Sequence, residues 1–180
     1  MKILLGVTGS VAAKLTQKLI TQLLSRGCEV RVITTESSLY FWMLQDVRVS
    51  VYRDVDEWKN GHYSKYSPVL HIDLRDWADI LLIAPLSANT LAKLSNGLAD
   101  NLLTCVARAW KTDNSMILAP AMNTHMWTHP ATKEQLKKLK SWNSKLVVIP
   151  PISKMLACGT EGVGAMAEID NIVEVVIQSN

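Results

Sequence analysis

A chain of 180 residues and 20.0 kDa is long enough for one domain with a full core and too short for two ordinary domains. Apolar residues make up 48% of the sequence and charged residues 19%, which excludes a disordered chain, and a net charge of +3 gives no reason to expect a nucleic-acid partner. Three cysteines without a CxxC pair argue against a disulfide framework and predict a reducing, cytoplasmic location. The apolar run at the N-terminus is too short for a membrane-spanning helix or a signal peptide.

Short apolar runs alternate with helical patterns along the chain. The runs predict strands buried on both faces at 2–7, 29–34, 79–85, 115–120 and 145–150, and helical patterns lie at 11–26, 88–96, 100–110 and 131–142. A further β-like run at 48–52 flanks the sheet. This alternation predicts one α/β domain over residues 1–180, a doubly wound, Rossmann-like or flavodoxin-like parallel sheet with helices on both faces.

Two segments lie outside this alternation. Residues 53–70 are polar and aromatic and predict an excursion over the surface. Residues 150–168 contain three glycines and two prolines without a clear period, and a loop of that length is usually functional or mobile.

Ligands of an open parallel sheet bind beyond the carboxyl ends of the strands, so the segments that follow the strands form one rim. After the first strand, Gly9 permits close backbone approach and Ser10 can cap a helix whose amides bind phosphate. Neither GxGxxG nor GK[ST] is present, so this is not a dinucleotide or P-loop motif. Hydroxyl and amide groups recur at 34–41, 86–93 and 120–127. Any one of these segments is explained by ordinary helix capping; the four together predict a phosphorylated ligand of mononucleotide size, without a metal.

Four longer motifs carry a family resemblance that covers nearly the whole chain. They are "VLHIDLRDWAD", "APLSANTLAKLSNGLADNLLTC", "PAMNTHMW", which matches a PxMNxxMW signature, and "KMLACGTEGVGAMAE". With these motifs the chain resembles the flavin-dependent cysteine decarboxylases, and within them the stand-alone enzymes that act on 4'-phosphopantothenoylcysteine in coenzyme A synthesis.

The resemblance implies roles for individual residues. It implies His71 as catalytic base, Asn123 as the ligand of the substrate's carboxylate, and Cys158 as the acid that protonates an intermediate in the final reduction. Substrate contacts are implied for Phe41, Asn123, Met126 and Lys154, with Met122 also lining the site. Contacts to FMN are implied for Gly9, Ser10, Val11, Thr35, Ser38, Ser87, Ala88, Asn89, Thr90 and Ala121.

The chemistry that the resemblance implies explains these residue types. A plain N-acyl cysteine carboxylate has no place for the electrons left by departing carbon dioxide. Oxidation by the flavin makes a thioaldehyde beta to the carboxylate, carbon dioxide leaves to give an enethiol, and hydride and proton then return to give 4'-phosphopantetheine. Histidine titrates near neutrality, as a base requires. The resemblance also implies a homotrimer in which His71 reaches a flavin held by the neighbouring subunit, and a monofunctional chain without a synthetase domain.

Several alternatives remain open at this stage. On its residues alone His71 is a structural or surface histidine, and only the resemblance reverses this. Asp76 stands where many relatives have arginine, which puts substrate affinity or assembly in question. Other functions on the same fold are decarboxylation of a peptide's C-terminal cysteine, a non-catalytic regulator, and a flavin prenyltransferase that would not need the Cys158 loop. Because regulators tend to lose one of His71, Asn123 or Cys158, which are all present, a regulator is the weaker alternative.

Overall fold

A six-stranded parallel sheet forms the centre of the computed structural model, which describes residues 1–45, 47–58, 67–155 and 161–179. The strands lie in the order β3-β2-β1-β4-β5-β6, and the winding reverses between β1 and β4. Their bounds are β1 Lys2–Val7, β2 Glu29–Thr34, β3 Val51–Tyr52, β4 Ile80–Leu86, β5 Ser115–Pro120 and β6 Leu146–Val148. The predicted doubly wound sheet is confirmed.

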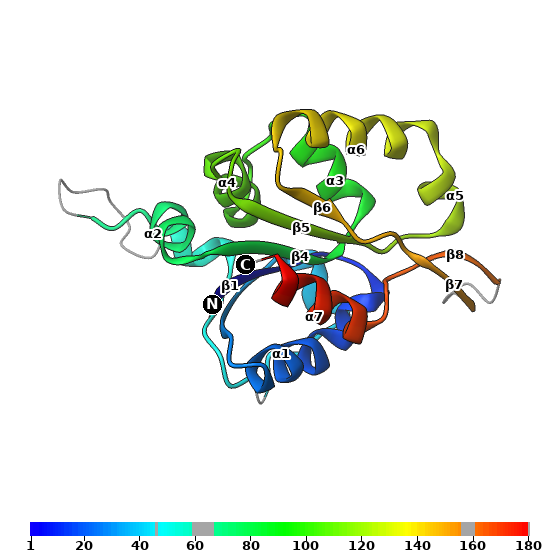
Figure 1. Cartoon of the computed structure of the whole chain (residues 1–180). Helices are drawn as coiled ribbons and strands as arrows, with labels where there is room; N and C mark the ends of the chain where they lie inside the picture. The colour runs from blue at the N-terminus through cyan, green and yellow to red at the C-terminus, as the bar shows by residue number, and fades with distance from the viewer. Residues whose placement is uncertain (46, 59–66, 156–160, 180) are drawn as a thin grey trace.

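Helices cover both faces of the sheet (Figure 1). On one face lie α1 (Thr16–Ser25) and α7 (Ile169–Gln178), and on the other lie α2 (Leu70–Trp77), α3 (Ala88–Ser95), α4 (Leu102–Ala109) and α6 (Pro130–Trp142). Short helices follow several strand ends: η1 (Val11–Leu15), η2 (Glu36–Tyr40), η3 (Asp54–Trp58) and α5 (Thr124–Thr128). The helix predicted at 11–26 thus begins with a 3₁₀ turn, and α7 was not among the predicted elements. Within the described part of the chain, none of the helices combines the length and the apolar character needed to cross a bilayer.

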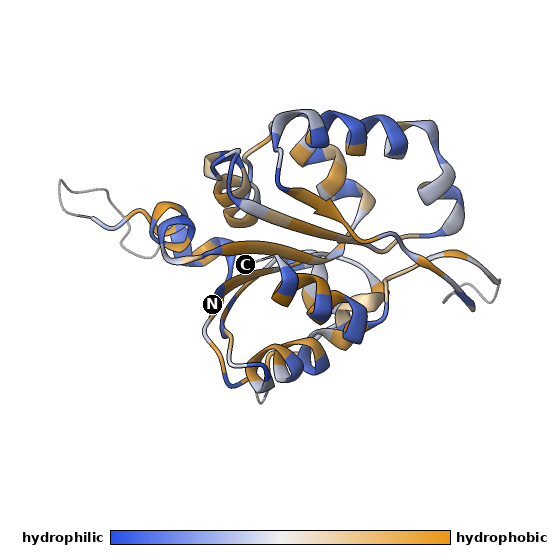
Figure 2. Cartoon of the chain, in the orientation of Figure 1, coloured by the Kyte–Doolittle hydropathy of each residue, from blue (hydrophilic) through white to orange (hydrophobic). Residues whose placement is uncertain are grey.

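Alternate side chains of the central strands enter two separate cores. Ile3 and Leu5 of β1 pack towards α1 and α7, whereas Leu4 packs towards α3 and α4, and all three are fully buried. Figure 2 shows the resulting pattern, with apolar strands between helices whose outer faces are hydrophilic. At Gly6 an added Cβ would lie 2.6 Å from Leu103 Cδ1, so the missing side chain lets α4 lie close to β1. Burial on both faces explains why the strands are apolar without alternation.

A β-hairpin replaces part of the irregular loop predicted at 150–168. Strands β7 (Ile152–Met155) and β8 (Glu161–Ala165) pair antiparallel, and the hairpin extends beyond the carboxyl ends of the sheet next to α5 (Figure 1). The Met122 N–H donates a hydrogen bond to the Gly164 carbonyl over 2.9 Å. A Cβ at Gly164 would collide with the Met122 carbonyl oxygen, and one at Gly162 with Thr124 Oγ1. The glycines that made this segment resemble a loop therefore let a strand pack against the end of β5.

Candidate active site at the carboxyl ends of the strands

Thr8 joins the two strand ends at the point where the winding of the sheet reverses. Its side chain is fully buried; its Oγ1 donates to the Pro85 carbonyl over 2.8 Å and accepts the Ser87 N–H over 2.8 Å. A crevice opens at such a reversal because neighbouring loops leave in opposite directions. Thr8 therefore fixes the relative position of the loops after β1 and β4, on both sides of the expected ligand.

The loops after β1 and β2 press against each other. Ser10 caps the 3₁₀ helix η1 by accepting the Ala12 N–H over 3.4 Å. An added Cβ at Gly9 would lie 2.5 Å from Ser37 Oγ, so only glycine allows this approach. The amides at the start of the helical segment and the nearby hydroxyls form the kind of cradle that binds a phosphate. This geometry fits the phosphate end of a mononucleotide such as FMN.

The hydroxyls of the second loop divide into supporting and exposed groups. Ser38 is fully buried: its Oγ donates to the Thr35 carbonyl over 2.6 Å and also bonds Thr34 Oγ1. Thr35 is also buried, and its Oγ1 lies 3.2 Å from Ser37 Oγ. Ser38 thus shapes the loop from beneath, and Ser37, which is exposed and faces Gly9, is the serine placed for ligand contact. Both serines belong to the same "TTESSLYF" segment, and the sequence alone cannot show which of them is buried.

The start of α3 presents a second set of amides at the rim. Ser87 is the N-cap residue: its Oγ accepts the Thr90 N–H and donates to Thr90 Oγ1, each over 3.2 Å. Thr90 is buried, Ala88 is half-buried and Asn89 is exposed. The hydroxyls of Ser87 and Thr90 therefore bond each other. The part of this segment that is open to a ligand is the Asn89 side chain, together with the backbone of the first turn of α3. Capping and ligand binding are compatible here, because a cap satisfies only some of the amides.

The segment after β5 places an amide at the rim on a buried base. Ala121 is buried, and its N–H donates to the Leu86 carbonyl over 2.9 Å, which attaches this segment to β4. Asn123 is exposed and caps α5, since its Oδ1 accepts the His125 N–H over 2.9 Å. Met122 is buried beneath the hairpin, whereas Met126 is 49% exposed. Of the two methionines expected to line the site, Met122 is thus covered by the hairpin and Met126 is open to solvent.

The remaining substrate-contact candidates lie on neighbouring elements. Phe41 ends η2, is partly buried against the core, and meets the exposed Tyr40 edge to face at 5.0 Å between ring centroids. Lys154 is exposed on β7 of the hairpin, where its Nζ lies 3.0 Å from Glu168 Oε1. Cys158, predicted as the acid, lies outside the described residues.

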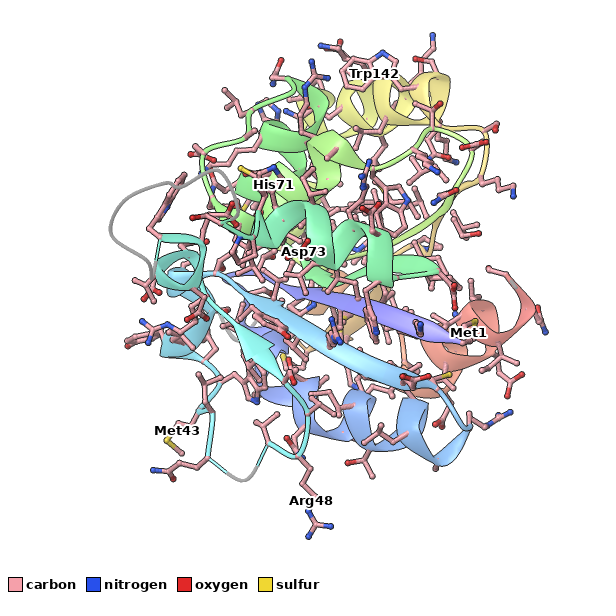
Figure 3. All side chains as sticks on the ribbon, turned by 90° about the vertical axis from the view of Figure 1, so that its left-hand side faces the viewer. Met1, Met43, Arg48, His71, Asp73 and Trp142 are labelled. Atoms are coloured by element: carbon pink, nitrogen blue, oxygen red, sulfur yellow. The ribbon has the colours of Figure 1, made fainter. Side chains whose placement is uncertain are left out.

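His71 lies far from Asn123 and Lys154. It is in the first turn of α2 and is labelled in Figure 3, and in Figure 1 α2 lies at the end of the molecule opposite to α5 and the hairpin. Its Nδ1 lies 2.7 Å from Glu57 Oε1, and its backbone N–H donates to Glu57 Oε2 over 3.1 Å. One chain therefore does not bring the predicted base to Asn123. Glu57 was not predicted from the sequence, because nothing in a polar surface segment marks it as the partner of a histidine fourteen residues later.

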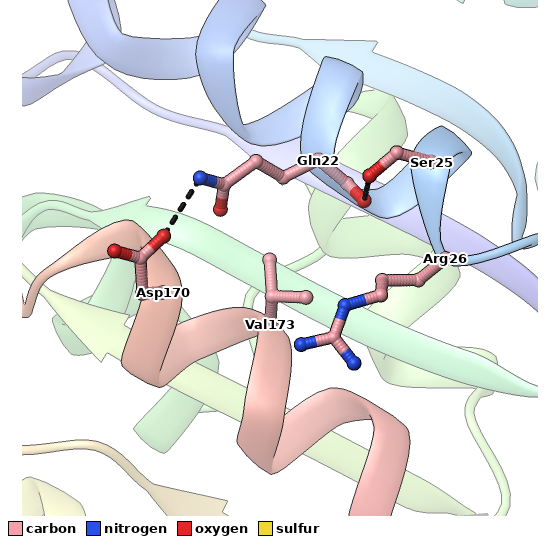
Figure 4. A pocket seen from close by; sticks show the side chains of 5 residues that line it. All are labelled: Gln22, Ser25, Arg26, Asp170 and Val173. Carbon is pink, nitrogen blue, oxygen red and sulfur yellow. Dashed lines mark hydrogen bonds between the residues drawn. The ribbon is translucent and has the colours of Figure 1, made fainter.

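Two cavities lie elsewhere, and neither is lined by a residue of the strand-end loops. One of about 230 Å³ lies between α1 and α7, where Gln22 Nε2 donates to Asp170 Oδ1 over 2.7 Å (Figure 4). The other, of about 380 Å³, lies among α3, α4 and α6. Both cavities lie between helices, away from the rim described above.

Comparison with known proteins places the chain among flavoproteins. The family model described as "Flavoprotein" matches residues 1–180. Phosphopantothenoylcysteine decarboxylase of Mus musculus is 51% identical over 173 residues, which cover 96% of this chain and 83% of that protein. A solved PPC decarboxylase mutant complexed with pantothenoylaminoethenethiol superposes with a TM-score of 0.92 at 46% identity, covering 98% and 96% of the two chains. The FMN binding protein AtHal3 gives a TM-score of 0.88 at 46% identity, covering 98% and 95%.

Proposed function

The chain belongs to the flavoprotein family, and we infer that it is a flavin-dependent phosphopantothenoylcysteine decarboxylase, a carboxy-lyase of coenzyme A synthesis. The observation that carries this inference is the agreement in sequence and fold, along almost the whole chain, with proteins of that name. The reaction converts 4'-phosphopantothenoylcysteine into 4'-phosphopantetheine and carbon dioxide.

We propose FMN as the flavin. The contact between Gly9 and Ser37 leaves no room for a side chain at the β1 turn, and a phosphate needs this kind of backbone approach. The phosphate and the ring would be held by Ser10, Ser37 and the first turn of α3. The other residues for which the resemblance implies FMN contacts would contribute as well. When bound, the flavin would supply the reversible two-electron oxidation of the carbon that carries the thiol.

The residues of the chain bind the substrate and move its protons. The Oδ1 of Asn123 is held by the His125 N–H, which orients the amide so that Nδ2 is the end that donates to a carboxylate. An amide grips the carboxylate without adding a positive charge that would hold its electrons in place. The thiol proton goes to a ring nitrogen of His71. Cys158 is proposed as the acid of the final step, and Phe41, Met126 and Lys154 as further substrate contacts.

Because His71 and Asn123 lie at opposite ends of one chain, a site that uses both requires two copies of the chain. We propose a homotrimer, with each active site at a subunit interface where α2 of one copy meets the strand-end rim of the next. In a closed ring of this kind each interface is heterologous, so three copies give three equivalent sites. A cytoplasmic location, favoured by the cysteine usage, is part of the same proposal.

The test is to purify the chain, record its visible spectrum, and follow carbon dioxide release by mass spectrometry after adding 4'-phosphopantothenoylcysteine. A flavin spectrum with release, abolished by His71→Asn, is the expected result. A flavin spectrum without release, combined with turnover of a peptide ending in cysteine, would transfer the activity to peptides. A colourless protein that cannot be loaded with FMN would overturn the proposal.

A further inference from the structure

Glu57 holds His71 at two points. One carboxylate oxygen lies 2.7 Å from the imidazole Nδ1, and the other accepts the backbone N–H of His71 over 3.1 Å. The Glu57 side chain is 8% exposed and that of His71 27% exposed, so the carboxylate lies beneath the ring. From this contact, and resting on the proposed role of His71, we propose that Glu57 is a positioning residue that sets the tautomer and orientation of the catalytic imidazole.

The tautomer follows from the inventory of donors and acceptors. A carboxylate offers acceptors only, so the hydrogen bond at 2.7 Å requires Nδ1 to carry the proton. The lone pair of the neutral ring is then on Nε2, for which the described residues provide no hydrogen-bond partner. Nε2 is therefore the atom that can take a proton from a substrate bound by the neighbouring copy.

The surrounding structure keeps Glu57 in place. It lies in η3, whose first residue, Asp54, accepts the Leu102 N–H over 3.0 Å and so attaches η3 to the start of α4. The N-cap position of α2 is Val69, which has no side-chain group to accept an amide. Glu57 supplies the missing cap from another element, and a negative charge at a helix N-terminus is favourable. The same carboxylate thus fixes the start of α2 and the ring that α2 carries.

Glu57→Gln separates these two contributions. An amide has one oxygen and one NH₂ group, and the backbone N–H of His71 can only donate, so it takes the oxygen. The NH₂ group then faces Nδ1, which must become the acceptor, and the ring proton moves to Nε2. The cap is kept, but the nitrogen that should accept the substrate's proton is already protonated. Asp54→Asn is the matched control, because it removes one charge from the same η3 helix while an amide oxygen still caps α4.

The experiment uses the full-length protein with ¹⁵N-labelled histidine and compares wild type, Glu57→Gln and Asp54→Asn, with His71→Asn assigning the ring signals. The ¹⁵N shifts of His71 report which nitrogen carries the proton. We expect the proton on Nδ1 in wild type and Asp54→Asn, and on Nε2 in Glu57→Gln. Decarboxylation should fall roughly 100-fold in kcat in Glu57→Gln with little change in KM, since a positioned base contributes about 10²–10⁴-fold. Asp54→Asn should stay within about twofold of wild type, as a retained cap predicts.

The outcomes distinguish the two proposals. If wild type releases no carbon dioxide, the proposed function fails, while the ¹⁵N shifts still test the role of Glu57. An unchanged tautomer with unchanged turnover in Glu57→Gln would overturn the positioning role.

Discussion

Subunits with His71→Asn and subunits with Asn123→Asp, each inactive alone, should regain decarboxylation when they are combined in one oligomer. The reason is that α2, which carries His71, and α5, which Asn123 caps, lie at opposite ends of one chain (Figure 1). Asn123→Asp places a carboxylate against the substrate's carboxylate, while Asp caps α5 as well as Asn does. Both variants should therefore fold and assemble while losing different halves of the same site.

The magnitude follows from how the sites are composed. A site is active when the copy that supplies His71 and the neighbour that supplies Asn123 are both intact at those positions. In a random equal mixture each condition holds for about half of the sites, so about one quarter of the wild-type rate should return. The assay is equal co-expression, purification over one affinity tag that both chains carry so that all oligomers are retained, and measurement of carbon dioxide release per bound flavin.

A second mixture makes the test sharper. Wild type mixed equally with a chain that carries both substitutions gives about one quarter of the wild-type rate if the two residues act from different copies, and about one half if they act within one copy. Mixed oligomers that bind flavin yet show no release, together with one half of the rate in this second mixture, would refute the division of the site between subunits.

Two further predictions concern the Thr8 hydroxyl beneath the rim and the Cys105 thiol in α4. Thr8→Val keeps the side-chain shape but leaves the Ser87 N–H without its acceptor, and the buried Pro85 carbonyl retains only the backbone N–H of residue 8. The substitution should cost about 2–3 kcal/mol of unfolding free energy and weaken flavin binding. The exposed Thr21→Val should cost about 0.5 kcal/mol or less, and denaturant titration measures both. Burial, and after it the charge of nearby carboxylates, raises the pKa of the Cys105 thiol, so alkylation followed by peptide mass mapping should be slower at pH 8 than for a free cysteine and should accelerate only at more alkaline pH.

The strands were predictable because burial on both faces leaves a continuous apolar run that other elements rarely show. α7 shows why similar composition can mislead: its Ile and Val residues favour strands, but Ile169, Ile172, Val173 and Val176 are buried at helical spacing. The hairpin was missed for a different reason. Its glycines fit a loop in the sequence, and only contact with the end of β5 shows that they serve close packing.

The candidate site was predictable only where it follows strand ends. Gly9, Ser87 and Asn123 each follow a strand directly, so the topology of the sheet brings them to one rim. The Glu57–His71 pair depends instead on how η3 packs on α2, which no local pattern records. Ser37 and Ser38 are the same residue type at adjacent positions. Which of them is exposed depends on the conformation of the turn that follows β2, and the sequence does not specify it.

Asp76, the position at which the family resemblance leads us to expect arginine, forms an ion pair within α2. Its carboxylate lies 2.8 Å from Arg75 Nη2, so the reversed charge is largely neutralised within α2. The Asp76 side chain is 60% exposed, and such surface pairs contribute little to stability, so the substitution changes the helix surface more than its packing. His71 precedes Asp76 by five positions, which corresponds to about 140° around the helix axis. The two side chains therefore leave α2 in different directions, and the support that Glu57 gives to the imidazole does not depend on which residue occupies position 76.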